Sequence, residues 1–325
     1  MGRVVASAPG KLILFGEHFV VKGYRAIATS ISLRARVTVE ESEGSWVELY
    51  SPTLGARSRV SLSLEEPVAR ELEVYVEILR ALRREGYSIV PHRVTVESEM
   101  PVAAGLGSSA ATSVAYTLAY TTLLGSPLQG DGLLRVSLEG EKVAHGRPSG
   151  VDNTIAAMGG TIVYRRGEKP VQVEARIPEG YTFIVADTGM KRSTRSVVEH
   201  VLGLAETLWD VSEHIYKASD ALVERALEAL RRGDMELLGK LMYVNHGLLV
   251  AMGASNLALD TLVNIAKASG ALGAKLTGAG WGGCIVALAR KGSEAETLAR
   301  ELSKHASSVR LVDIHVPGAT VEELR

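Results

Sequence analysis

The sequence predicts an α+β fold arranged in two lobes, and three observations support this. The chain has 325 residues, which exceeds the size at which a single hydrophobic core usually stops growing. Segments with apolar residues at every second position alternate with segments at the three-and-four spacing of amphipathic helices. After residue 187 the pattern becomes mostly helical before strands return. We expect the boundary near residue 180, which gives lobes 1–180 and 181–325.

Composition and charge exclude several classes of protein. The formal net charge is −1, from 36 Lys and Arg against 37 Asp and Glu, which argues against a nucleic-acid partner. No apolar run approaches the roughly 20 residues that a membrane-spanning helix needs, so no membrane partner is expected. Cys284 is the one cysteine, and the chain starts on a patterned strand without a secretory leader. These features predict a cytoplasmic protein.

The first half of the chain predicts a sheet with helices on it. Period-two patterns predict strands over 28–40, 46–50 and 92–97. A further strand, 3–7 and 12–15, is expected to be broken by a turn at 8–11 that places Lys11 at a bend. Helical spacing predicts helices over 67–85, 108–124 and 133–145.

The second half predicts a helix-rich layer with strands of its own. A strand is expected over 181–187, followed by a long helical region with helices over 226–232, 235–253 and 257–269. Strands at 274–276, 284–289 and 309–316 then flank a helix at 293–305, so this half is also mixed α and β.

The glycine-rich segment 101–112 (PVAAGLGSSAAT) is the strongest single signal of chemistry. Gly105, Gly107, Ser108 and Ser109 come directly before a helical pattern. Glycines allow backbone N–H groups to turn inward, and the positive end of a helix dipole adds to them, so this segment could bind phosphate. It matches neither the Walker A motif nor the dinucleotide fingerprint. The alternative is a plain strand-to-helix turn with a serine cap.

Two carboxylates, Glu141 and Asp152, flank a turn in the segment 140–153. Glu141 falls on the same helical stripe as Leu134 and Leu138, so it should point inward. An inward carboxylate needs a partner, and Mg²⁺ is commonly held by one or two carboxylates together with substrate phosphates. Alternatively, Glu141 pairs with an arginine and Asp152 caps the helix that begins near Thr154.

Three further segments carry candidate residues. Segment 7–21 places Lys11 beside Pro9-Gly10 and brings Glu17 and His18 after a glycine, although a lysine on such a loop is more often a solvated charge. Segment 275–284 has four glycines in six residues, which permits close backbone approach or simply a tight turn, with Cys284 as a core residue. Segment 187–195 combines three cations with two hydroxyls and could hold a carboxylate or form a solvated helix cap.

Taken together, these segments resemble the GHMP small-molecule kinases, the superfamily of galactose, homoserine, mevalonate and phosphomevalonate kinases. The Lys11 segment, residues 101–111 and residues 275–284 match that family's three motifs in order, and the resemblance spans nearly the whole chain. It implies an N-terminal lobe like ribosomal protein S5 domain 2 and a ferredoxin-like C-terminal lobe, with ATP and the acceptor between them.

Within the superfamily, two segments resemble the mevalonate kinases. Phe19-Val20-Val21 follows Gly16-Glu17-His18, where galactokinases are expected to have Thr-Asp-Tyr, and residues 145–153 also resemble the mevalonate branch. Trp281 departs from it, because that position is often glycine in the branch. Other acceptors, namely galactose, homoserine, shikimate or phosphomevalonate, remain alternatives, as does a nucleotide-binding relative without kinase activity.

The resemblance also implies roles for individual residues. Asp152 is expected to be the catalytic carboxylate with Lys11 as its partner, and Ser109 and Glu141 the ligands of Mg²⁺. Glu17, His18, Thr194 and Arg195 are expected to line the acceptor pocket. The implied ATP-binding residues are Pro101, Ala103, Ala104, Gly105, Leu106, Gly107, Ser108, Ser109, Ala110, Gly278 and Gly280. Many relatives are dimeric, which favours a homodimer.

Overall fold

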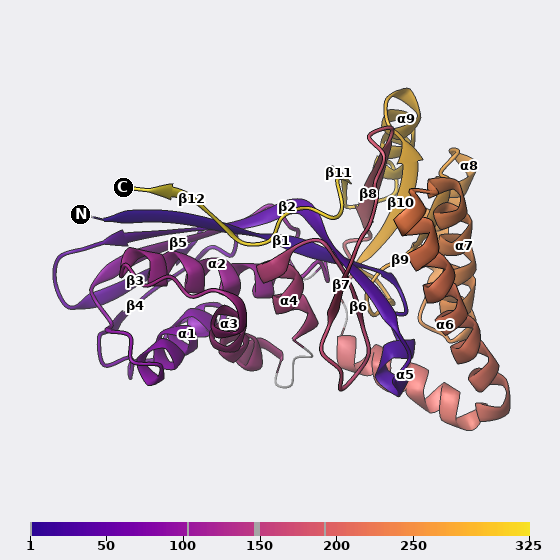
Figure 1. Cartoon of the computed structure of the whole chain (residues 1–325). Coiled ribbons are helices and arrows are strands. Elements are labelled where there is room, and N and C mark those ends of the chain that lie inside the picture. Colours follow the sequence, from indigo (N-terminus) through magenta and orange to yellow (C-terminus); the bar gives the residue numbers. More distant parts are fainter. Residues whose placement is uncertain (1, 103, 146–149, 192) are drawn as a thin grey trace.

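The computed structural model describes residues 2–102, 104–145, 150–191 and 193–325, and within them the strands form an eight-stranded and a four-stranded sheet. We call these the first and second sheets. Helices pack against both sheets, and the α+β class predicted from the sequence is confirmed (Figure 1). Among the described residues, no helix is both long and apolar enough to cross a membrane.

The first sheet is largely antiparallel and contains the predicted strands. Its order is β12-β1-β2-β5-β3-β4, with β6 added to β2 and β7 to β6, and only β3 and β5 run parallel. The strands are β1 (Arg3–Phe15), β2 (Ala26–Glu41), β3 (Trp46–Ser51), β4 (Ala56–Ser61), β5 (His92–Ser98), β6 (Thr161–Tyr164), β7 (Val171–Val173) and β12 (Thr320–Leu324).

Four helices accompany this sheet, and three of them were predicted. They are α1 (Glu73–Arg84), α2 (Ser108–Leu123), α3 (Gly130–His145) and α4 (Val151–Met158), with short 3₁₀ turns η1 (Phe19–Lys22) and η2 (Arg70–Leu72). Helix α2 is buried along nearly all of its length, because alanines and threonines let it lie close to β1 and β2. This central position fixes the glycine-rich segment at its N-terminus.

The expected turn at residues 8–11 is wrong, because β1 is one continuous strand. The register against β2 shifts between Pro9 and Gly10, so the strand carries a bulge instead of a break. A side chain at position 10 would collide with the sulfur of Met100 and the carbonyl of Leu106. Gly10 therefore lets the glycine-rich segment approach the strand, and the backbone N–H of Lys11 donates to the Leu106 carbonyl oxygen at 2.8 Å.

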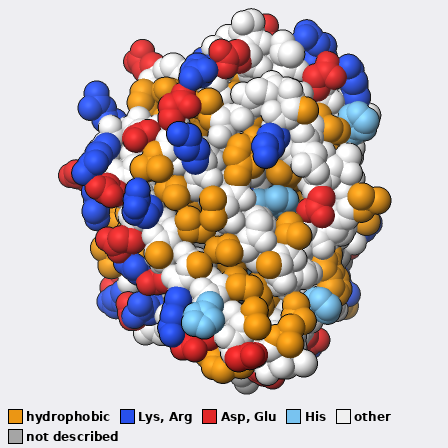
Figure 2. All heavy atoms as spheres, turned by 90° about the vertical axis from the view of Figure 1, so that its right-hand side faces the viewer, with side chains coloured by type: hydrophobic (Ala, Val, Ile, Leu, Met, Phe, Trp, Pro, Cys, Tyr) orange, Lys and Arg blue, Asp and Glu red, His pale blue; other side chains and the backbone are white. Residues whose placement is uncertain are grey.

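The second sheet has the order β11-β8-β10-β9, and all its pairings are antiparallel. Its strands are β8 (Tyr181–Asp187), β9 (Gly273–Leu276), β10 (Cys284–Arg290) and β11 (Ser308–Val312). The helices of this part are α5 (Thr194–Thr207), α6 (Trp209–Arg232), α7 (Met235–Ala251), α8 (Leu257–Ala268) and α9 (Ser293–Ser303). Figure 2 shows hydrophobic side chains scattered over the face on the right of Figure 1.

The last strand of the chain lies beside the first. After β11, strand β12 returns to the first sheet and pairs with β1, and the backbones of Arg3 and Arg325 exchange two hydrogen bonds at 2.9 Å (Figure 1). The expected boundary at residue 180 falls between β7 of the first sheet and β8 of the second. Residues 320–324 nevertheless belong to the first sheet, because β12 covers the edge of β1.

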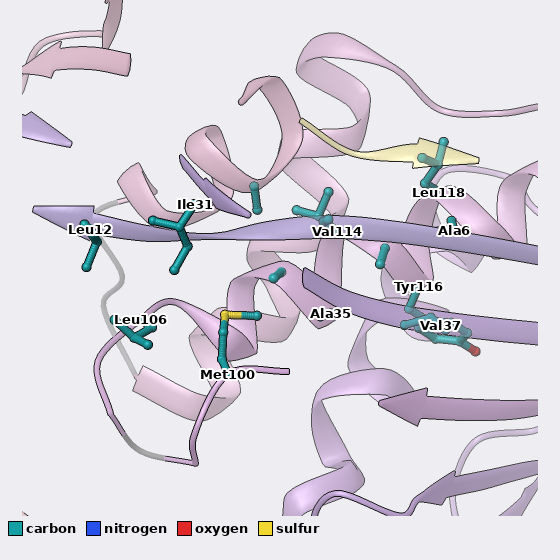
Figure 3. Packing of buried hydrophobic residues seen from close by; sticks show 14 of the residues in the cluster. Ala6, Leu12, Ile31, Ala35, Val37, Met100, Leu106, Val114, Tyr116 and Leu118 are labelled. Carbon is teal, nitrogen blue, oxygen red and sulfur yellow. The ribbon is translucent and has the colours of Figure 1, made fainter. Parts of the chain in front are cut away.

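A core between β1, β2 and α2 anchors the segment that leads to the site. Figure 3 shows Leu12 and Ile31 of the strands with Val114 of the helix, and beside them Met100 and Leu106. Met100 and Leu106 lie on the connection from β5 to α2, and each is 2% exposed. Their burial holds the glycine-rich connection at both ends. Cys284 is buried in the same core cluster, as predicted.

Candidate active site

Lys11 and Asp152 form an ion pair, although 141 positions separate them in the sequence. The Lys11 ammonium lies 3.4 Å from Oδ1 of Asp152. Lys11 projects from β1 and is only 7% exposed, whereas the Asp152 side chain is 39% exposed in the first turn of α4. A carboxylate in the first turn of a helix is stabilised by the helix dipole. The pair therefore presents an accessible carboxylate backed by a fixed cation.

The glycine-rich segment ends directly beside this ion pair. Gly105 and Gly107 have φ values of 81° and 79°, a left-handed conformation that favours glycine. Gly107 is the N-cap of α2, has no side chain to cap it, and packs against the Lys11 stem. The first backbone N–H groups of α2 therefore remain available, as a phosphate site requires. Ala103, another predicted ATP contact, lies outside the described residues.

Ser109 and Glu141 meet across α2 and α3. The Ser109 hydroxyl donates to Oε1 of Glu141, whose side chain is buried with 3% of the residue exposed. One carboxylate and one hydroxyl are oxygen ligands that suit Mg²⁺ when substrate phosphates complete its coordination. No group of three or more His, Cys, Asp or Glu side chains in the described parts of the chain is arranged for a metal. Ser109 and Glu141 together therefore offer two oxygen ligands to a metal.

Glu17 is turned into the protein interior. Its Oε1 accepts a hydrogen bond from the ammonium of Lys275, and its Oε2 accepts one from Nδ2 of Asn245 at 3.1 Å. The side chains of Lys275 and Glu17 are 0% and 1% exposed. Burial lowers the pKa of Lys275, and the Glu17 carboxylate opposes that effect.

His18 lies next to the second glycine-rich segment. Its Nε2 is 2.7 Å from the carbonyl oxygen of Ala279. A carbonyl oxygen can only accept, so Nε2 carries the proton and donates. Burial lowers the pKa of His18 despite this hydrogen bond, so the imidazole is neutral over a wider pH range than a free histidine.

The glycine-rich segment 278–283 makes close backbone contacts, as its glycine density indicated. Gly280 has φ +87°, and a side chain there would overlap the Ala254 carbonyl oxygen. Trp281 also has a positive φ of 55°, which is unusual for a bulky residue. Its indole N–H donates to the Gly253 carbonyl at 2.8 Å, and its ring lies 4.9 Å from that of His200. These contacts stabilise the strained backbone.

Thr194 and Arg195 lie in the first turn of α5, and both are exposed. Among the described residues, no hydrogen bond or ion pair joins either side chain to Lys11, Asp152 or His18. The connection that leads from β8 to α5 contacts the second glycine-rich segment, because the backbone N–H of Thr188 donates to the Gly283 carbonyl at 2.9 Å. Arg192 and residues 146–149 of the predicted motifs lie outside the described residues.

Reasoning from sequence missed several residues around the site. Thr277 binds Ile13 near the end of β1, and Lys275 and Asn245 bind Glu17. Burial raises the pKa of the Tyr164 phenol, and the charges of Asp152 and Glu17 raise it further. A buried lysine or asparagine looks like any other polar residue in a sequence. Only the acidic partner at Glu17, which is far away in the chain, explains their burial.

Comparisons with known proteins identify the family of this chain. The GHMP kinases N terminal domain model matches residues 73–161, and the GHMP kinases C terminal model matches residues 226–308. The chain belongs to the GHMP kinase family. It is therefore an ATP-dependent phosphotransferase that acts on a hydroxyl group.

Within the family, the chain is similar to several mevalonate kinases. A mevalonate kinase of Aeropyrum pernix is 48% identical over 320 residues, covering 98% of each chain. A mevalonate kinase of Thermococcus gammatolerans is 37% identical, covering 99% of each. Among solved structures, mevalonate kinase of L. major in complex with R-mevalonate matches with a TM-score of 0.82 at 28% identity, over 98% of this chain and 96% of that one. The Methanococcus jannaschii enzyme matches with a TM-score of 0.85 at 26% identity, over 95% and 98%.

Proposed function

We propose that this chain transfers the γ-phosphoryl group of ATP to the 5-hydroxyl of mevalonate, a step in isoprenoid precursor synthesis. The observation that carries the proposal is the Lys11–Asp152 pair beside the N-terminus of α2. The full-length similarity to mevalonate kinases supports this acceptor over the other alcohols of the family.

The chemistry asks the chain to align two reactants and to offset charge. Asp152 is exposed enough to accept a hydrogen bond from the acceptor hydroxyl and to take its proton as the bond to phosphorus forms. Lys11 holds that carboxylate in place through the ion pair and stabilises the negative charge that develops on the acceptor oxygen. Both side chains are held by secondary structure, so little ordering is needed when the reactants bind.

The phosphates would lie at the start of α2. The backbone N–H groups after Gly107 would donate to phosphate oxygens, and Ser109 and Glu141 would provide ligands for Mg²⁺. When bound there, Mg²⁺ would offset charge on the β and γ phosphates. Gly278 and Gly280 would also contact ATP. They lie in the segment whose Ala279 carbonyl accepts the hydrogen bond from His18.

The acceptor would lie between His18 and the first turn of α5. Arg195 could bind the carboxylate of mevalonate through two parallel hydrogen bonds, and Thr194 could donate a hydroxyl to it. Glu17 would support this pocket from behind, because its carboxylate already binds Lys275 and Asn245.

A panel of acceptors tests the proposed function. Purified protein with Mg-ATP is offered mevalonate, galactose, homoserine, shikimate or phosphomevalonate, and ADP release is measured. Mevalonate should give a kcat/KM at least about 10³-fold above every other acceptor, because a site that binds specific polar groups rejects analogues lacking them. A higher value for another acceptor would reassign the substrate, and no ADP release with any would contradict kinase activity.

The proposal extends to the state of the protein in the cell. We place it in the cytoplasm, since its one cysteine is a buried free thiol that needs no oxidising compartment. We also propose a homodimer, and exposed hydrophobic residues on α7 and at the start of α8 (Val244, Val250 and Leu257) are candidates for contacts in it. Light scattering after size exclusion should give about twice the mass of one chain.

A further inference from the structure

Two polar side chains at the end of β9 reach across to β1. The Thr277 hydroxyl donates to the carbonyl oxygen of Ile13 at 3.0 Å and accepts the backbone N–H of the same residue at 3.2 Å. Two positions earlier, and hence on the same side of the extended chain, the Lys275 ammonium lies 3.5 Å from the Ile13 carbonyl. Side chains of the second sheet therefore bind both the N–H and the carbonyl group of Ile13 in the first sheet.

The Glu17 carboxylate adds further contacts between the same two parts of the molecule. Lys275 binds Glu17, four residues beyond Ile13, and Asn245 of α7 binds the other oxygen of that carboxylate. Lys275, Glu17 and Thr277 are each at most 5% exposed. Burying an ammonium is costly unless its partners are well placed, so Lys275 requires the Glu17 carboxylate to stay within hydrogen-bond distance.

These contacts lie close in sequence to residues of the candidate active site. Lys11 lies two residues before Ile13 on β1, and His18 follows Glu17 directly. Thr277 directly precedes Gly278, the first glycine of the second glycine-rich segment. One hydroxyl thus joins the strand that carries the reactive lysine to the segment whose Ala279 carbonyl holds His18.

We infer that Thr277 and Lys275 are positioning residues that set β1 against the second glycine-rich segment, and so place the Lys11 ammonium for phosphoryl transfer. This inference rests on the proposed function, because it concerns the alignment of Lys11 with Asp152 and the phosphates. Neither residue needs to touch a substrate. Their effect is on alignment, where displacement by about 1 Å can cost about 10²-fold in rate.

A matched pair of variants separates positioning from ordinary stability. Thr277→Val keeps the shape of the side chain and removes the hydroxyl. Thr182→Val is the control, because Thr182 is 4% exposed in β8 and its hydroxyl bonds to carbonyls of Phe183 and Val312, both in the second sheet. Both variants lose a buried hydroxyl bonded to backbone, but only Thr277→Val loses a link to β1.

The test measures kcat, both KM values and the thermal midpoint of each variant. Thr277→Val should lower kcat by about tenfold or more, with both KM values within about threefold, whereas Thr182→Val should keep kcat within about twofold at a similar loss of thermal midpoint. Thr277→Ser, which retains the hydroxyl, should recover kcat to within about threefold of the original enzyme. Thr277→Ala, which needs no room for a second methyl group, should show the same loss as Thr277→Val.

Equal kcat values for Thr277→Val and Thr182→Val, or no recovery in Thr277→Ser, would overturn the inference. Either result would leave the proposed function intact, provided that the original enzyme still prefers mevalonate in the acceptor panel. Failure of that panel would instead remove the proposed function, and the positioning claim with it.

Discussion

Lys11 illustrates how a single long basic side chain becomes a fixed cation. Its backbone N–H donates a hydrogen bond to the Leu106 carbonyl, its stem packs against Gly107, and its ammonium pairs with Asp152. A side chain held in this way has already lost the rotamer freedom that a surface lysine keeps. The entropy was therefore lost on folding and need not be lost again in the reaction.

Glu141 allows a residue-scale prediction for the metal. Glu141→Gln replaces a carboxylate oxygen by a neutral amide oxygen at the buried contact with Ser109. The Mg²⁺ concentration that gives half-maximal activity should rise by about tenfold or more at fixed ATP, since hard cations prefer charged oxygen ligands. A Mg²⁺ titration of the steady-state rate measures this.

Glu139 is the control on the same helix. Its carboxylate lies 2.6 Å from the Lys142 ammonium and is partly exposed, so Glu139→Gln changes the same charge away from Ser109. That variant should keep the Mg²⁺ dependence of the original enzyme. Equal shifts in the two variants would mean that Glu141 acts only through overall charge and is not a ligand.

At the scale of elements, local patterns predicted many of the helices and strands, but they missed β4, β6, β7 and β12 and did not predict how elements bend. Helix α2 and strand β8 have the predicted boundaries to within one residue, because apolar periodicity is a local property. The bulge in β1 was predicted as a turn, since Pro9-Gly10 signals either one. What decides between them is Met100, about 90 positions further along the chain, and no local pattern contains it.

The contact between α7 and β9 gives a prediction at this scale. Gly239 of α7 and Gly273 of β9 face each other, and a side chain at Gly239 would collide with the Leu272 carbonyl. Gly239→Ala should therefore push the helix from the strand and lower the free energy of unfolding by about 2 kcal/mol or more. Denaturant unfolding measures the change.

Gly247 lies on the same helix with no atom near the place of a side chain. Gly247→Ala should raise stability by about 0.5–1 kcal/mol, because alanine restricts the unfolded chain more than glycine does and favours helix. If both alanine variants were stabilising, the close approach of α7 and β9 would be contradicted.

At the scale of the whole molecule, contacts between distant segments hold the two sheets together. The guanidinium of Arg25, just before β2, donates two hydrogen bonds to the Asp220 carboxylate of α6, at 3.0 and 2.8 Å, and also contacts Glu224. Strand β12 joins the first sheet from the other end of the chain. Pairings of this kind are set by three-dimensional packing and not by sequence periodicity, so the return of residues 320–324 to the first sheet was not predicted, whereas the α+β fold class was.

The same limit applies to the candidate site. Lys11, Asp152, Ser109 and Glu141 could be named from motifs, because each stands in a recognisable segment, and the structure brings them together in two pairs. Thr277 and Lys275 could not be assigned a role, since their role depends on the backbone of Ile13, more than 260 positions away.

The claim on which the rest depends is that the Lys11–Asp152 pair is the reaction centre. Asp152→Asn keeps the shape of the side chain and removes its charge and its ability to accept a proton. We predict that kcat for mevalonate phosphorylation falls by about 10²–10⁴-fold, while the dissociation constant for Mg-ATP changes by less than about threefold. An Asp152→Asn enzyme that kept kcat within about threefold of the original would contradict the account.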